Sequence, residues 1–151
     1  MKPKCKIKSN GTKCWYLNNK LHRTDGPVIE YSSGAKEWYI NGKRHRENGP
    51  AIEFSSGTKF WYLNDKLHRE DGPAIEYPNR SKYWYLNGKL HREDGPAVEC
   101  INGYKEWYLN GKQISEEGFI RIKRYCKTCK SLLLFTKAIN KYIIYCPKCQ
   151  R

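Results

Sequence analysis

An all-β fold is predicted for this chain of 151 residues: a single-layer, up-and-down β-meander of about five hairpin repeats, followed by a small four-cysteine module. Three features predict it. The five tryptophans recur every 23 residues, short aromatic segments alternate with turn dipeptides such as Asn-Gly, and two Cys-x-x-Cys pairs end the chain. The tryptophans are Trp15, Trp38, Trp61, Trp84 and Trp107.

The same 23-residue period holds for other residue types. All four histidines, a following arginine, a Gly-Pro pair and a glutamate repeat in register, and the last copy decays after Lys112 as a terminal cap would. The predicted array covers residues 1–120 and the basic module 121–151. The repeats lie near 11–33, 34–56, 57–79, 80–102 and 103–120.

Each unit is predicted to form a hairpin. The segment 36–40 is aromatic and β-branched, and Asn41-Gly42 favours a type I′ turn because both residues tolerate positive φ. A second strand, 51–54, follows Gly-Pro and ends at the turn residues 55–57. Two strands per unit give about ten strands.

Alternation assigns the two faces of the sheet. We expect Trp38, Ile40, Ile52 and Phe54 on one face, and tyrosine, alanine and glutamate side chains on the other. A single layer leaves the tryptophan face in need of a cover, which curvature, the C-terminal segment or a partner would supply.

The segment KEWYINGKRHRENGPAIEFSSG, residues 36–57, resembles the MORN repeat. The resemblance covers roughly residues 11–120, and it departs from the family at the His-Gly-x-Gly step, where this chain has His-Arg-x-Asp/Asn-Gly-Pro. It implies a curved scaffold for proteins, for self-association or for anionic lipid. The variant is similar to divergent arrays of phage, giant-virus and bacterial proteins, which implies a virus-encoded protein acting on host machinery in the host cytoplasm.

The stretch His91-Arg92-Glu93-Asp94 has the composition of an active site, but its four registered copies favour an architectural role. The aspartate can cap the Gly-Pro turn, and the histidine and arginine can bond carbonyls or the glutamate of a neighbouring strand. We therefore predict a protein without catalytic residues. Tyrosine and arginine are enriched in binding hot spots, so we expect a protein partner on the sheet. The candidate contact residues are Tyr16, Tyr39, Tyr62, Tyr85, Tyr108, Arg46, Arg69 and Arg92.

The two Cys-x-x-Cys pairs, with 16 residues between them, match the spacing of a structural zinc site. Four thiolates complete a tetrahedron around one Zn²⁺ and leave no open position. We predict Cys126, Cys129, Cys146 and Cys149 as the ligands, and Cys5, Cys14 and Cys100 as packing residues. The segment resembles a zinc ribbon, a fold whose members most often contact nucleic acid or its machinery.

The net charge of +14 lies at the two ends of the chain. Residues 1–13 carry +5, residues 14–120 are balanced, and residues 121–151 carry +9 without one acid. Cations interleaved with aromatic rings suit phosphate contact and base stacking, although part of the charge offsets a zinc tetrathiolate. The candidate contacts are Lys123, Arg124, Lys127, Lys130, Lys137, Lys141, Tyr142 and Lys148.

The N-terminus has no apolar stretch of a signal peptide, and no run of the chain approaches the roughly 18 apolar residues of a membrane span, so a cytoplasmic location is expected. The main hypothesis is a small adaptor or inhibitor that binds a protein with its sheet and nucleic acid or a nucleoprotein with its ribbon. The alternatives are a purely protein-binding or self-associating scaffold, as a homodimer, with the ribbon as a cap, and attachment to anionic membrane through the basic ends.

Overall fold

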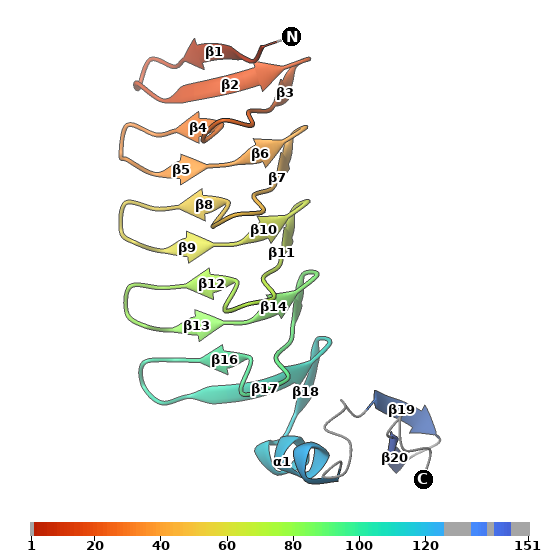
Figure 1. The fold of residues 1–151 in the computed structure, drawn as a ribbon. Helices are drawn as coiled ribbons and strands as arrows, with labels where there is room; N and C mark the ends of the chain where they lie inside the picture. Colours follow the sequence, from red (N-terminus) through yellow and green to blue (C-terminus); the bar gives the residue numbers. More distant parts are fainter. Residues whose placement is uncertain (1, 126–133, 139–140, 146–151) are drawn as a thin grey trace. The chain divides into compact units, whose positions relative to one another are not determined.

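The computed structural model describes residues 2–125, 134–138 and 141–145, with side chains described for residues 2–120. The chain divides into two units, residues 1–112 and 113–151. The first unit contains one antiparallel sheet of 12 strands, whose order follows the sequence and whose last strand extends to residue 114, and this confirms the predicted all-β meander (Figure 1). Its strands are β1 (Lys4–Ile7), β2 (Lys13–Leu17), β3 (Lys20–Leu21), β4 (Ile29–Glu30), β5 (Lys36–Glu37), β8 (Ile52–Glu53), β9 (Lys59–Phe60), β12 (Ile75–Glu76), β13 (Lys82–Tyr83), β16 (Val98–Glu99), β17 (Lys105–Leu109) and β18 (Lys112–Ile114).

Three inner repeats also carry a separate two-stranded hairpin at one side of the main sheet (Figure 1). In these three repeats the predicted long strand is therefore divided at its tryptophan, whereas β2 and β17 continue through Trp15 and Trp107. The Trp38 N–H donates to Ala51 O of the main sheet at 2.8 Å, while its carbonyl accepts from His45 N–H of its own hairpin at 3.1 Å. Tryptophan is thus the residue at which the chain changes hydrogen-bonding partner. The hairpins pair β6 (Tyr39–Ile40) with β7 (Lys43–Arg44), β10 (Tyr62–Leu63) with β11 (Lys66–Leu67), and β14 (Tyr85–Leu86) with β15 (Lys89–Leu90).

The turns of these hairpins have the predicted conformation. Asn41 and Gly42 adopt φ of 53° and 82°, and the Asn64-Asp65 pair adopts 50° and 64°. Positive φ at both central residues is the signature of the type I′ turn, whose twist matches that of the flanking strands. The asparagine-rich tips of the repeats therefore follow directly from local turn chemistry.

The register between strands corrects one expectation from the sequence. Ile52 lies opposite Glu37 on one side and opposite Phe60 on the other, and directly opposed residues share a face. Ile52 therefore lies on the face of Glu37 and Tyr39, not on that of Trp38. The expected grouping of tryptophan with isoleucine and phenylalanine is wrong, and we name the two sides the Trp face and the Tyr face.

The Trp face of the same strands carries alternating charges. Glu53 lies opposite Lys36 and Lys59, and the same alternation of lysine and glutamate continues through the sheet from Lys13 to Lys105. Opposite charges in directly opposed positions stabilise an antiparallel pair modestly and fix its register. This ladder is one reason why the array is rich in charge and yet balanced.

The second unit contains a helix that the sequence reasoning did not predict, α1 (Glu116–Tyr125). Its N-terminus is capped by Ser115, whose Oγ accepts the N–H of Gly118 at 3.0 Å, and its first turn carries Glu116 and Glu117. The unit also contains an antiparallel hairpin in which Leu134 pairs with Tyr145. Its strands are β19 (Leu134–Ala138) and β20 (Lys141–Tyr145).

Candidate binding surfaces of the repeat array

On the Trp face, each repeated arginine lies flat on the tryptophan of its own repeat. The Cζ atom of Arg69 is 4.2 Å from the ring centroid of Trp61, and that of Arg92 is 3.8 Å from Trp84. The same guanidinium also approaches the glycine of Gly-Pro closely, because a Cβ at Gly72 would lie only 2.9 Å from Arg69 Cζ. The glycine is therefore required by a close approach, and the arginine is held in a layered contact.

Each of these arginines also donates hydrogen bonds within its own repeat. Arg69 donates from Nε to Asp71 at 2.9 Å, and from Nη1 to Pro73 O at 3.2 Å and to Glu76 at 2.9 Å. The hydrogen bond from Arg69 lowers the pKa of the exposed Asp71 carboxyl. The predicted bonds from arginine to a carbonyl and to a glutamate are confirmed, whereas the aspartate contacts the arginine where a bond to the turn was expected.

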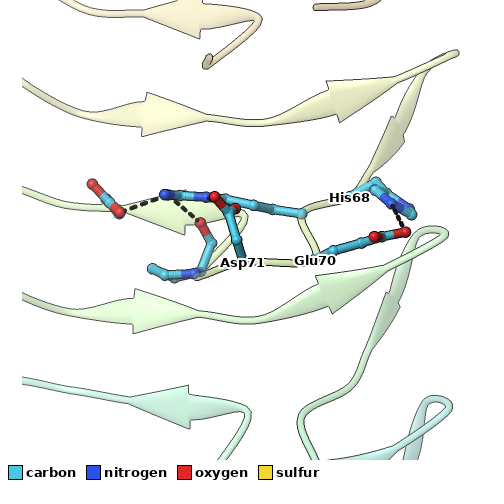
Figure 2. A network of polar contacts seen from close by, with 6 residues as sticks. His68, Glu70 and Asp71 are labelled. Carbon is cyan, nitrogen blue, oxygen red and sulfur yellow. Dashed lines mark hydrogen bonds and ion pairs between the residues drawn. The ribbon is translucent and has the colours of Figure 1, made fainter. Parts of the chain in front are cut away.

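The repeated histidines connect one repeat to the next. The backbone N–H of Asn87 donates to Nδ1 of His68 at 3.2 Å, and the Asn87 side-chain amide lies 3.0 Å from the same nitrogen. The other ring nitrogen, Nε2, lies 3.6 Å from Glu70 Oε1, so the ring and this carboxylate face each other while Asp71 points elsewhere (Figure 2). The backbone N–H of Arg69 adds a bond to Tyr85 O of the following repeat at 3.1 Å. Histidine and arginine thus have defined positions in the stacking of repeats.

The Tyr face presents a ridge of aromatic rings. Phe60 contacts Phe54 and Tyr77 edge to face at 5.9 and 6.2 Å between ring centroids, and Tyr77 contacts Tyr83 at 5.8 Å. Edge-to-face contacts of this kind stabilise beyond simple burial. The ridge is partly open, because Phe54 is 45% exposed and Tyr77 37% exposed. We call Phe54, Phe60, Tyr77 and Tyr83 the aromatic ridge.

Carboxylates at Glu37 and at the equivalent Glu106 interrupt this aromatic surface with charge. Glu37 accepts hydrogen bonds from the hydroxyls of Tyr31 at 2.8 Å and Tyr39 at 2.6 Å. Burial and the bond to Glu37 raise the pKa of Tyr31 to about 12. Arg44 lies near the rings of Tyr39 and Tyr62, and within the described residues its buried Nε atom has no hydrogen-bond partner.

The sequence-predicted contact residues fall on two different faces. The tyrosines Tyr16, Tyr39, Tyr62, Tyr85 and Tyr108 lie on the Tyr face, one in each repeat, and are buried or half-buried. The arginines Arg46, Arg69 and Arg92 lie on the Trp face with their guanidinium groups packed on tryptophan. The structure therefore does not bring the two sets together. The sequence did not predict the aromatic ridge as a group, although the six-residue spacing from glutamate to lysine across the turn after each repeated glutamate indicates the register that produces it.

The predicted zinc ligands lie outside the described residues, as do Lys127, Lys130 and Lys148. Lys123 and Arg124 belong to α1, Lys137 to β19, and Lys141 and Tyr142 to β20. Because Leu134 and Tyr145 are paired, the chain enters and leaves this hairpin at the same end, next to the Cys146-Pro-Lys-Cys149 pair in the sequence.

Elsewhere in the described part of the chain, no group of three or more histidine, cysteine or acidic side chains has the arrangement of a metal site. None of the described helices is long and apolar enough to cross a bilayer. No protein-family model and no curated protein matches this chain.

Proposed function

We propose that this protein is a non-enzymatic adaptor or inhibitor whose repeat array binds a protein partner through the Tyr face. The observation that carries the proposal is the aromatic ridge, which is ordered by ring-to-ring contacts yet remains partly exposed at Phe54 and Tyr77. Rigid aromatic side chains supply much contact area at little entropic cost, which is why they dominate binding hot spots. The resemblance of the array to MORN repeats, which are scaffolds, agrees with this role.

A binding role is also supported by the state of the His-Arg-x-Asp residues. In each of several repeats the arginine is stacked on tryptophan and bonded within its own loop, and the histidine is bonded to the next repeat. Groups engaged in this way hold the array together and are poorly placed to act on a substrate. The protein is therefore expected to lack catalytic activity.

We further propose that Cys126, Cys129, Cys146 and Cys149 hold one structural Zn²⁺ and that the basic residues around them contact nucleic acid or a nucleoprotein complex. Four thiolates suit a closed zinc site, and the paired ends of β19 and β20 support a hairpin between the two cysteine pairs. When bound, the ion would supply folding energy to a segment too short to form a core. A viral origin and action on host machinery remain part of the proposal through the MORN-like resemblance alone.

The partner surface is tested by substitution on the aromatic ridge. Phe54→Ser with Tyr77→Ser removes two exposed rings, and Ile7→Ser with Ile101→Ser is the matched control, because both isoleucines are exposed and lie outside the ridge. Proteins captured from the native host by the full chain would be compared quantitatively among the three forms. A partner retained by the control and lost by the ridge variant supports the proposal, and equal recovery by all three contradicts it.

The nucleic-acid role is tested separately with salt-dependent gel shifts of single-stranded DNA and RNA. The intact chain is compared with a chain ending after Ser115, which keeps β18 and removes the basic segment. Binding that weakens with salt and disappears in the shorter chain is expected. No binding by the intact chain at low salt would leave the purely protein-binding alternative, in which the balanced array alone carries the function.

A further inference from the structure

A groove follows the loops on the Trp face, on the side of the sheet opposite the aromatic ridge. One hollow of about 680 Å³ is formed between repeats 57–79 and 80–102, and another of about 690 Å³ between repeats 34–56 and 57–79. Arg69, Glu70 and Asp71 line both hollows. The two hollows are therefore neighbouring sections of one groove, and equivalent wall positions recur every 23 residues.

The groove combines an apolar part with an acidic part. Trp84 and Leu86, both half-buried, contribute apolar surface to the first hollow, and the equivalent Trp61 and Leu63 contribute it to the second. Carboxylates stand out toward solvent. The side chain of Glu70 is 83% exposed, and that of Glu93 45% exposed.

The cations along the groove are already engaged. The first hollow is lined by two arginines and four acidic residues. Each arginine is stacked on a tryptophan and donates hydrogen bonds to an aspartate and to a proline carbonyl. Each also donates to a glutamate that lies outside the lining. The lining thus has an excess of negative charge in an array that is balanced as a whole. Over a Debye length of roughly 8–10 Å these local charges decide which ligand is attracted.

The spacing of the groove selects an extended occupant. Two strands per repeat place equivalent carboxylates about 10 Å apart along the stack. Three residues of a polyproline II segment make one turn, which spans about 9 Å and returns the side chain to the same side. A cation at every third position would therefore lie next to each repeated carboxylate in turn, while the intervening residues lie against tryptophan and leucine.

From this geometry we infer that the Trp-face groove is a docking site for an extended, lysine- or arginine-rich segment of another protein, with basic residues about three positions apart. The segment lies along the stack of repeats, and its ammonium or guanidinium groups pair with Glu70 and Glu93. This surface is separate from the Tyr face of the proposed function, so the two can be tested independently.

The test measures fluorescence anisotropy of a labelled peptide of four Lys-Pro-Pro triplets with the full chain. A peptide of the same composition with its four lysines in one block is the spacing control, and a peptide of four Glu-Pro-Pro triplets is the charge control. The evenly spaced basic peptide is expected to bind most tightly, with an affinity that falls as salt is added.

The matched protein variants change the same charge at two places. Glu70→Gln with Glu93→Gln removes two carboxylates from the groove without touching the arginine stacks, and Glu116→Gln with Glu117→Gln makes the same change in α1. The groove variant is expected to weaken peptide binding about three- to tenfold, since exposed ion pairs contribute modestly, and the helix variant is expected to leave it unchanged.

Each outcome decides the inference. Equal affinity of the groove variant and the wild type, tighter binding of the acidic peptide, or equal binding of the evenly spaced and the blocked peptide would overturn it. Self-association of the wild type that the groove variant abolishes would also overturn it in its stated form, because the occupant would then be a second copy of this chain.

Discussion

The layered contact of tryptophan, arginine and glycine makes a sharp prediction for Gly72→Ala. Gly72 does not have a positive φ, so its backbone accepts alanine. The new Cβ, however, would lie 2.9 Å from Arg69 Cζ and 3.1 Å from Nε. The guanidinium is held in place, because its Cζ lies 4.2 Å from the Trp61 ring centroid and it donates to Asp71, Pro73 O and Glu76. The substitution must therefore displace the arginine.

The cost has two sources. Overpacking a close contact costs about 1–3 kcal/mol, and displacement of the guanidinium weakens a cation–π contact of about 0.5–1 kcal/mol. The middles of these ranges add to about 2.7 kcal/mol, and the entropic gain from alanine offsets about 0.7 kcal/mol, so we expect Gly72→Ala to lower the free energy of unfolding by about 2 kcal/mol. Without the guanidinium, the effect of Gly72→Ala on the free energy of unfolding should reverse in sign. In an Arg69→Ala background the added methyl group meets no such contact, and alanine stabilises by about 0.4–1 kcal/mol through the entropy of the unfolded chain.

The measurement is a double-mutant cycle in urea. Equilibrium unfolding of the wild type, both single variants and the double variant, followed by circular dichroism, gives the interaction free energy between Gly72→Ala and Arg69→Ala. A large coupling with reversed sign supports the layered contact as the reason for glycine. Equal destabilisation by Gly72→Ala in both backgrounds would refute it and would place the cause in the backbone.

Three further predictions follow from the same contacts. In an NMR titration the Asp71 carboxyl carbon should have a midpoint below pH 3.8, because Arg69 lowers the pKa of this carboxyl. The stabilisation from this ion pair is present above pH 3.8 and is lost as the pH falls through the lower pKa of the folded state. Arg69→Met should return the midpoint to about 3.8. Arg80→Gly should raise the free energy of unfolding by about 1 kcal/mol, because Arg80 adopts φ of 68° where other repeats have glycine; no gain in a urea titration would contradict the strain. Cys126→Ser should abolish binding of one Zn²⁺ per chain, measured by atomic absorption after dialysis, while Cys5→Ser should keep it; full zinc content in Cys126→Ser would count against the four-thiolate site.

Much of the array could be predicted because its signals are local. The Asn41-Gly42 turn needs positive φ at both residues, and only a few residue types provide it cheaply. The 23-residue period then extends one such turn to the whole array. The division of the inner strands at tryptophan could not be predicted in this way, because it depends on which neighbour supplies hydrogen bonds to Trp38.

The faces were misassigned because alternation orders residues within one strand and not between strands. The missing information was the register across the turn after Glu53. Lys59 lies opposite Glu53, six residues later, and the same spacing joins glutamate to lysine in other repeats. Opposed charges are favoured in such positions, so this spacing predicts the register and moves Ile52 to the tyrosine side. Register, not composition, creates the aromatic ridge.

The helix α1 was missed for a different reason. Residues 113–119 were interpreted as a decaying copy of the repeat, so the helix signals within them were overlooked. Ser115 followed by Glu116 and Glu117 is a helix start, since the serine oxygen caps a free N–H and the acids complement the helix dipole. A decaying copy of a sequence repeat can thus contain a different secondary structure, with its own local start signals.

The two faces of one sheet are chemically opposed, and this favours an adaptor over a scaffold with a single partner. The Tyr face offers aromatic edges at Phe54 and Tyr77, whereas the loops of the Trp face offer carboxylates at Glu70 and Glu93 around a half-buried apolar surface. A ligand that depends on ion pairs with exposed carboxylates is poorly complementary to the aromatic ridge, and an apolar surface gains nothing from the carboxylates of the groove. Loss of peptide binding should therefore follow substitution of Glu70 and Glu93 while capture of the ridge partner persists, and the reverse should hold for Phe54 and Tyr77. Joint loss of both binding activities in either variant would mean that the two surfaces serve one partner that wraps the sheet.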